Sequence, residues 1–190
     1  MSINLLKEQL ERAKIVKEGD YEYLLSSITE QSPAIDPAIL EDCGNKLMQK
    51  LNYKKATKIL TAESMGIPIS IVLSLKTGLP LIIATKRKKR TFDEISVDYI
   101  CGYENGYLDI NNIGRNEKII IIDDLISSGK TIFSMIETVD KIGATVEDIG
   151  AIFSKSDFSG IKELKKVGFR PKILLDVRFR DGRPEVEIIG

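Results

Sequence analysis

A chain of 190 residues with 43% hydrophobic and 29% charged residues can build the core of one folded domain and is too apolar for a disordered tail. Its 28 basic and 28 acidic residues cancel, so no overall charge would draw the chain to nucleic acid or to a membrane. The chain contains no histidine, which excludes Ser-His-Asp and Cys-His catalysis and histidine-ligated zinc or iron.

The cysteines and the apolar runs favour a cytoplasmic protein. Cys43 and Cys101 are too far apart for a CxxC pair, and such sparse cysteines are typical of reduced, buried thiols. The opening MSINLLKEQLERAK lacks the apolar core of a signal peptide. The longest apolar runs are far shorter than the roughly 20 residues that span a bilayer.

The N-terminal part of the chain is predicted to contain two helices separated by a polar stretch. Ser2 can cap a first helix, in which Leu6, Leu10 and Ala13 recur at helical spacing. A short segment at 21–25 and a polar stretch follow. Asp36-Pro37 then marks the start of the next helix, because a capping carboxylate precedes a proline in the first turn. One face of that helix is lined by Leu40, Cys43, Leu47 and Leu51.

The rest of the chain alternates between strand-like and helix-like segments. The strand-like segments are 58–61, 79–84, 95–100, 106–110, 118–122, 144–153, 172–177 and 185–189. The helix-like segments are 67–75, 129–142 and 160–167. This alternation predicts an α/β fold with an open, mostly parallel twisted sheet flanked by helices. In such sheets ligands bind beyond the carboxyl ends of the strands, here after Ala62, Ala84 and Ile122.

The segment IIIIDDLISSGKT, residues 119–131, carries the strongest chemical signal. A buried strand leads to two adjacent carboxylates, Asp123 and Asp124, and then to small and hydroxylic residues that open a helix. Free N–H groups at a helix N-terminus, with Ser and Thr hydroxyls, suit a phosphate monoester, and Gly129 allows close approach of the anion. The carboxylates would suit a ribose diol, Mg²⁺ or a developing cation.

Two other interpretations of this segment explain less. An ordinary buried strand with a capping aspartate accounts for neither the second carboxylate nor the Ser-Ser-Gly-Lys-Thr run. A nucleotide P-loop would require glycine where Asp124 stands.

The segment resembles the phosphoribosyl pyrophosphate signature of type I phosphoribosyltransferases. The order of further segments resembles the archaeal hypoxanthine (purine) branch, with kinship to adenine phosphoribosyltransferases. Those segments are KEGDYEYLLSSITEQSPAIDP, KILTAESMGIPIS, SLKTGLPLIIATKRK and GYENGYLDI. The resemblance implies one domain over 1–190, with residues 1–36 forming an N-terminal hood within it.

The resemblance implies roles for the residues around the signature. Asp123 and Asp124 would lie against the ribose hydroxyls and favour an oxocarbenium-like transition state as the catalytic pair. The 5′-phosphate would be held by Ser127, Ser128, Gly129, Lys130 and Thr131. Magnesium is implied as a cofactor, carried by the substrate with Asp123 and Asp124 as its nearest carboxylates.

The pyrophosphate end of the site is implied to include a loop and the start of a basic run. The loop residues are Glu63, Ser64, Met65 and Gly66. Ser64 alternatively caps the following helix. Lys86 and Arg87 begin a basic run that ends at Arg90 and would neutralise the leaving group, whereas most such runs are only solvated surface.

Leu125 is implied to cover one face of the base. The hood segment 24–29 is implied to contact the purine edge through backbone groups, with Leu25 as an apolar contact. Leu125 is equally well explained as core packing. Lys155 would donate to O6 of a 6-oxopurine and is badly placed for an exocyclic amine, or it is a surface lysine.

The sequence departs from the family pattern where a general acid would stand. Ser127 replaces an aspartate of some purine enzymes, and Gly102 replaces a glutamate of the adenine enzymes. The segment Thr91-Phe92-Asp93-Glu94 replaces the usual glycine-proline pair of this loop. Asp93 and Glu94 are either solvated or able to reach the base when the loop closes. Catalysis would then depend mostly on positioning and electrostatics.

The resulting hypothesis is a purine-salvage transferase that forms IMP or GMP and pyrophosphate, acting as a homodimer. The alternatives are an adenine phosphoribosyltransferase, a non-catalytic sensor of phosphoribosyl pyrophosphate that binds DNA, and an inactive adaptor. The zero net charge disfavours the DNA-binding sensor, and the intact segment 123–131 disfavours the adaptor. No nucleic acid or membrane partner is expected.

Overall fold

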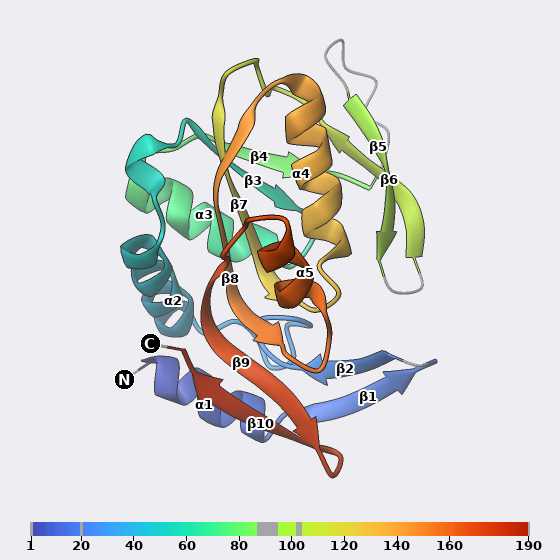
Figure 1. Cartoon of the computed structure of the whole chain (residues 1–190). Coiled ribbons are helices and arrows are strands. Elements are labelled where there is room, and N and C mark those ends of the chain that lie inside the picture. The colour runs from blue at the N-terminus through green and yellow to red at the C-terminus, as the bar shows by residue number, and fades with distance from the viewer. Residues whose placement is uncertain (1, 20, 87–94, 102–103, 190) are drawn as a thin grey trace.

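The central sheet has the strand order β10–β9–β8–β7–β3–β4, in which β10 pairs antiparallel with β9 and the other neighbours are parallel (Figure 1). A computed structural model describes residues 2–19, 21–86, 95–101 and 104–189. The strands of the sheet are β3 (Lys58–Ala62), β4 (Leu81–Ala84), β7 (Lys118–Ile126), β8 (Thr145–Lys155), β9 (Lys172–Arg180) and β10 (Arg183–Ile188). The predicted mostly parallel α/β sheet is confirmed.

Helices cover both faces of the sheet. These helices are α2 (Pro37–Lys50), α3 (Gly66–Thr77), α4 (Lys130–Ile142) and α5 (Gly160–Lys166), with the short 3₁₀ helix η1 (Tyr53–Lys55) after α2. Successive side chains of a strand point to opposite faces. Accordingly Ile120 and Ile122 pack into the core beneath α2 and α3, whereas Ile119 and Ile121 pack beneath α4. Because both faces of β7 are buried, the first part of its sequence is an unbroken run of isoleucines.

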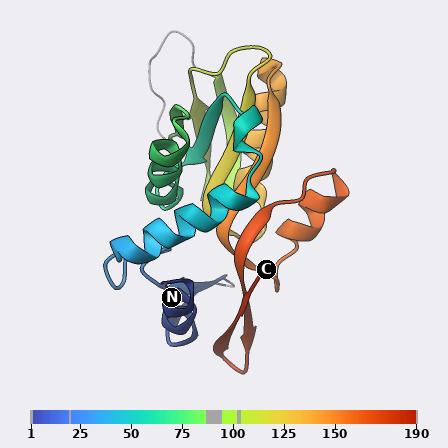
Figure 2. The same ribbon diagram turned by 90° about the vertical axis from the view of Figure 1, so that its left-hand side faces the viewer.

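The N-terminal segment lies across the carboxyl ends of β7 and β8 (Figure 1). It consists of α1 (Ser2–Glu11) and a hairpin of β1 (Lys14–Glu18) and β2 (Tyr21–Leu25). Helix α1 packs against β10 and α2, and Figure 2 shows this whole layer at one end of the molecule. The sequence pattern predicts α1 and a segment at 21–25 but does not predict β1, because a short edge hairpin is polar on its outer side.

A second hairpin stands beside α4 and is formed by β5 (Ile95–Cys101) and β6 (Glu104–Ile110). It is joined to the residue after β4 by two backbone hydrogen bonds. The Thr85 N–H donates to the Asp109 carbonyl at 3.1 Å, and the Asp109 N–H donates to the Thr85 carbonyl at 2.8 Å. The two strands predicted at 95–100 and 106–110 therefore form one hairpin outside the main sheet.

Two of the boundaries that differ from the prediction affect the hood and the site. Helix α1 ends at Glu11, so Ala13 lies after it rather than on its apolar face. Strand β7 continues through Asp123 and Asp124 to Ile126, because Leu125 and Ile126 still pair with β8 in parallel register. The acidic pair is thus held in a strand and not in a loop.

Helix α2 begins where the sequence predicts it. Asp36 is the N-cap, and its Oδ1 accepts a hydrogen bond from the Ala38 N–H at 2.8 Å. Gly44 lets α2 approach α3 closely, since a Cβ there would lie 2.4 Å from Cγ1 of Val72. None of the described helices combines the length and the apolarity needed to cross a membrane.

Asp36→Ala removes the cap of α2 and leaves the Ala38 N–H without its side-chain acceptor. We expect the free energy of unfolding to fall by about 1 kcal/mol. Urea titration of the purified variant measures this change, and Asp36→Asn, which keeps an acceptor oxygen, is the control that should retain most of the stability.

Candidate active site

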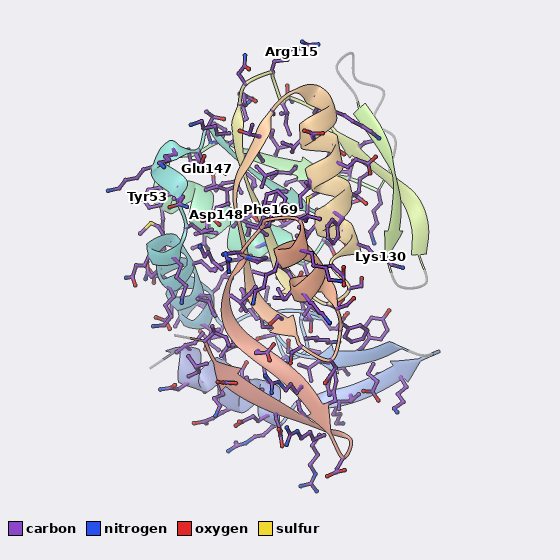
Figure 3. The ribbon with its side chains drawn as sticks, viewed as in Figure 1. Tyr53, Arg115, Lys130, Glu147, Asp148 and Phe169 are labelled. Carbon is purple, nitrogen blue, oxygen red and sulfur yellow. The ribbon has the colours of Figure 1, made fainter. Side chains whose placement is uncertain are left out.

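A cavity of about 230 Å³ lies at the carboxyl ends of β3, β7 and β8, beneath the hood. Figure 3 shows Lys130 at the hood end of α4, with Arg115 at the opposite end of the molecule. Residues from three loops, from β7 and β8, and from the hood line the cavity. They are Tyr23, Leu24, Thr29, Glu30, Ala62, Glu63, Ser64, Met65, Lys86, Asp123, Asp124, Leu125, Ile126, Ser127, Ser128, Gly129, Lys130, Thr131, Ile132 and Lys155.

The acidic pair lies in the cavity wall at the end of β7. The N–H of Asp124 donates to Oδ1 of Asp123 at 3.0 Å. Burial raises the pKa of the Asp124 carboxyl well above its usual range, and the neighbouring Asp123 raises it further. These two effects favour the protonated form of Asp124, and a ligand that supplies hydroxyl donors would favour the charged form.

The segment 127–131 forms a tight loop that leads into α4. Gly129 adopts φ +76° at the N-cap, and its missing side chain lets the loop pack against Gly160, because a Cβ there would lie 3.2 Å from the Gly160 Cα. The first N–H groups of α4 have no partner within the helix and suit an anion. The Gly160 N–H donates to the Ser127 carbonyl at 3.0 Å and supports the loop from behind. A Cβ on Gly160 would lie 2.2 Å from that carbonyl oxygen, so only glycine fits this contact.

The segment 63–66 forms the second loop, between β3 and α3. The peptide bond between Glu63 and Ser64 is cis. Gly66 lies behind the cavity wall, where a Cβ would be 2.8 Å from Oδ1 of Asp123, and its lack of a side chain brings this loop against the acidic pair. The N-cap of α3 is Met65, which makes no side-chain capping bond, so the alternative role of Ser64 as the cap is not adopted.

A hydrogen bond from the Lys86 N–H to Oε1 of Glu63 connects this loop to the third one. The negative charge of Glu63, unexpected beside a pyrophosphate site, therefore has a positioning role. Lys86 itself lines the cavity. Arg87, the rest of the basic run to Arg90, and the loop positions 93, 94 and 102 lie outside the described residues.

Lys155 is a buried residue and not a surface lysine, with an exposed fraction of 1%. Its Nζ donates to the Glu22 carbonyl of β2 at 2.6 Å and lies 5.3 Å from the centre of the Phe179 ring. Burial lowers the pKa of the Lys155 ammonium to about 8, although nearby carboxylates oppose the shift. Lys155 thus connects the end of β8 to the hood and faces the cavity from there.

Leu25, the predicted hood contact, is not among the described residues that line the cavity, whereas its neighbours Tyr23 and Leu24 are. A contact of Leu25 with the base stays a prediction. Leu125 lines the cavity and also packs against the core.

Sequence reasoning missed the residues that shape the hood turn and the back of the phosphate loop. Thr29 Oγ1 donates to the Leu24 carbonyl at 2.6 Å, and the Thr29 N–H donates to Ser26 Oγ at 3.2 Å. The hydroxyl cluster Ser-Ser-Ile-Thr is the signal that indicates such a turn. No local sequence pattern points to Gly160, because its hydrogen-bond partner Ser127 lies 33 positions earlier in the chain.

Comparisons with known proteins agree with this geometry. A family model described as the phosphoribosyl transferase domain matches residues 34–169. The chain belongs to this family. Its fold also matches solved structures of adenine phosphoribosyltransferases: the enzyme of Saccharomyces cerevisiae has a TM-score of 0.75 at 17% identity, with 90% of this chain and 97% of that one covered. The enzyme of Thermoanaerobacter pseudethanolicus has a TM-score of 0.72 at 18% identity, covering 93% and 99%.

Among curated phosphoribosyltransferases, archaeal proteins are similar over nearly the whole chain. A hypoxanthine/guanine phosphoribosyltransferase of Aciduliprofundum boonei is 34% identical, with 97% of this chain and 99% of that protein covered. One from Methanohalophilus mahii is 36% identical, with 99% and 98% covered. The sequence resemblance to the archaeal purine branch of this transferase family is confirmed.

Gly160→Ala places a methyl group against the Ser127 carbonyl and should displace the phosphate loop. Because displacements of about 1 Å can reduce activity by about 10²-fold, we expect a loss of that order in affinity for ribose 5-phosphate. Isothermal titration calorimetry measures it. Gly114→Ala is the control, since a Cβ there comes no closer than 3.8 Å to another atom; equal affinities in the two variants would contradict the supporting role of Gly160.

The lowered pKa of Lys155 predicts how stability depends on pH. Between about 8 and the ordinary value of 10.5, the unfolded chain binds more protons at this residue than the folded chain does. The contribution of Lys155 to stability therefore increases as pH rises through this interval. Denaturant titrations between about pH 7.5 and pH 9.5 measure the effect.

In Lys155→Met the free energy of unfolding should no longer show this increase with pH. Lys162→Met, which changes an exposed lysine of α5, is the control and should still show it. Parallel stability curves for the wild type and Lys155→Met would contradict the assigned pKa.

Proposed function

We propose that this protein transfers the phosphoribosyl group of phosphoribosyl pyrophosphate to a 6-oxopurine, hypoxanthine or guanine, in purine salvage. The products are IMP or GMP and pyrophosphate. The observation that carries the proposal is a single cavity that combines the acidic pair, the loop 127–131 and the loop 63–66 with the buried Lys155. The curated relatives named hypoxanthine/guanine phosphoribosyltransferases support the choice of base.

The loop 127–131 would hold the 5′-phosphate and so fix the sugar. Backbone N–H groups at the start of α4 supply the donors, and Ser127, Ser128 and Thr131 add hydroxyls. With the phosphate held there, the sugar ring extends along β7 toward Asp123 and Asp124. The site thereby converts a reaction between two molecules into one between aligned groups.

Asp123 and Asp124 would accept hydrogen bonds from the ribose hydroxyls. As the bond from C1′ to pyrophosphate breaks and a ring nitrogen of the base bonds to C1′, positive charge develops on the ribose. The two carboxylates lie in a largely buried wall, where their stabilisation of that charge is greater than in water. This electrostatic contribution needs no histidine.

The leaving pyrophosphate would lie against the loop 63–66 and Lys86. The Lys86 ammonium and the backbone N–H groups of this loop face the negative charge, while the Glu63 carboxylate is directed to the Lys86 N–H. We include Arg87 in this role on the family resemblance alone.

Magnesium fits this site as a substrate-borne ion. Mg²⁺ is commonly held by one or two carboxylates together with substrate phosphates, and Asp123 and Asp124 offer such carboxylates. In the described part of the chain no cluster of three or more acidic or cysteine residues forms a complete protein site. The ion would neutralise charge on the departing pyrophosphate.

Lys155 favours a 6-oxopurine over adenine. Its ammonium can donate to O6, whereas the exocyclic amine of adenine is itself a donor. The adenine phosphoribosyltransferases that share this fold are less than 25% identical and so inform the fold alone.

We also propose that the protein acts as a cytoplasmic homodimer. Ile71 and Leu75 lie one turn apart on α3 and are 45% and 81% exposed. An exposed apolar pair on the helix that follows the loop 63–66 would be covered by a second copy. Sedimentation equilibrium tests this assembly.

The deciding experiment offers hypoxanthine, guanine, xanthine, adenine and orotate to the purified protein with phosphoribosyl pyrophosphate and Mg²⁺. Turnover of hypoxanthine or guanine supports the proposal. Turnover of adenine alone would assign the protein to the adenine enzymes. Binding of phosphoribosyl pyrophosphate without turnover of any base would indicate a sensor.

Asp124→Asn should lower kcat about 10²- to 10³-fold, because it removes a negative charge beside the developing cation. The same change removes the repulsion between Asp123 and Asp124, so we expect the melting temperature to be unchanged or higher. Asp140→Asn, on the exposed face of α4, is the control and should leave both quantities unchanged. Wild-type turnover in Asp124→Asn would exclude its catalytic role.

A further inference from the structure

The hood contributes a carboxylate, Glu30, to the same end of the cavity as Lys155. We propose that Glu30 is a second base-recognition residue, whose carboxylate accepts hydrogen bonds from N1–H of a 6-oxopurine and from the 2-amino group of guanine. This inference rests on the proposed function, because it assigns specificity within that same site.

The position of the base follows from the polarity of the cavity. The loop 127–131, at which the 5′-phosphate is proposed to bind, lines the cavity together with the hood and the end of β8. A molecule whose phosphate lies at this loop would present its base to the hood, at Glu30, Lys155 and Tyr23. Among these side chains, Glu30 offers acceptor oxygens and Lys155 offers N–H donors.

Glu30 and Lys155 both line the cavity and form no salt bridge with each other within 4.0 Å. The positive charge of Lys155 acts on the Glu30 carboxyl, and the Glu30 charge acts on Lys155. Among the described residues, however, Glu30 makes no side-chain hydrogen bond and no salt bridge within 4.0 Å. A donor and an acceptor held apart in this way can each contact a ligand that lies between them.

The arrangement is complementary to a 6-oxopurine. The Watson–Crick edge of such a base presents O6, an acceptor, next to N1–H, a donor, and guanine adds a 2-amino donor. Adenine presents an amino donor next to an acceptor at N1, so both contacts would be mismatched. A site with buried polar groups rejects a ligand that leaves them unpaired far more strongly than an apolar pocket does.

The backbone around Glu30 holds it in place. Its N–H donates to the Ser26 carbonyl at 3.0 Å, within the turn that Thr29 closes onto the Leu24 carbonyl. On the other side, Gln31 Nε2 donates to Met65 Sδ at 3.5 Å, across to the loop 63–66. Glu30 is exposed, but the burial of part of its side chain raises the pKa of its carboxyl. A bound base would exclude more water from it.

Glu30→Gln keeps the size of the side chain and removes its charge and one acceptor oxygen. We expect kcat/KM for guanine to fall roughly 10- to 100-fold, with a smaller loss for hypoxanthine and none for adenine. Calorimetric binding of GMP, IMP and AMP should show the same order without turnover. Glu187→Gln on β10 is the matched control, since it changes an exposed glutamate far from the cavity.

Each outcome decides the assignment. Losses that follow the order guanine, hypoxanthine, adenine support it, provided that phosphoribosyl pyrophosphate binds as in the wild type. Equal losses for all bases, no loss, or weakened binding of phosphoribosyl pyrophosphate would overturn it while leaving the proposed function intact. A wild type that uses no 6-oxopurine would instead overturn the proposed function, and the role of Glu30 with it.

Discussion

The double burial of β7 is the constraint on which the site depends. Its isoleucines are packed on both faces, under α2 and α3 on one side and under α4 on the other. A strand held in this way cannot rotate or slip without exposing one apolar face. Asp123 and Asp124 therefore project from a rigid support, and the cost of placing two carboxylates side by side is offset by the burial of the preceding run.

The loops around the acidic pair are held in place by close contacts with other segments of the chain. Gly66 allows the loop 63–66 to touch Asp123, and Gly160 allows α5 to support the carbonyl of Ser127. Glu63 connects the second loop to the third through the Lys86 N–H. Because the atoms next to Gly160 belong to the backbone, a methyl group there would displace the whole loop 127–131 rather than one side chain.

The hood gives the cavity its chemical asymmetry. One end, at α4, offers backbone N–H groups and hydroxyls that suit phosphate. The other end combines the buried ammonium of Lys155 with hood residues, and Lys155 joins the two parts through the Glu22 carbonyl. A lysine buried to 1% exposure is costly unless it is hydrogen-bonded, and its hydrogen bond to the hood is one such compensation.

Local patterns in the sequence are enough to predict the α/β class, the family, the strand that leads to Asp123 and Asp124, and the loop 127–131. These patterns are an apolar run, two adjacent carboxylates and the residues of a helix N-terminus. The tertiary structure decided what depends on distant partners. It placed Tyr23 and Leu24 in the cavity wall, where the sequence predicts Leu25. It also buried Lys155 beneath the hood and placed Gly160 behind Ser127. No periodicity within one segment encodes such contacts, because packing alone brings the two segments together.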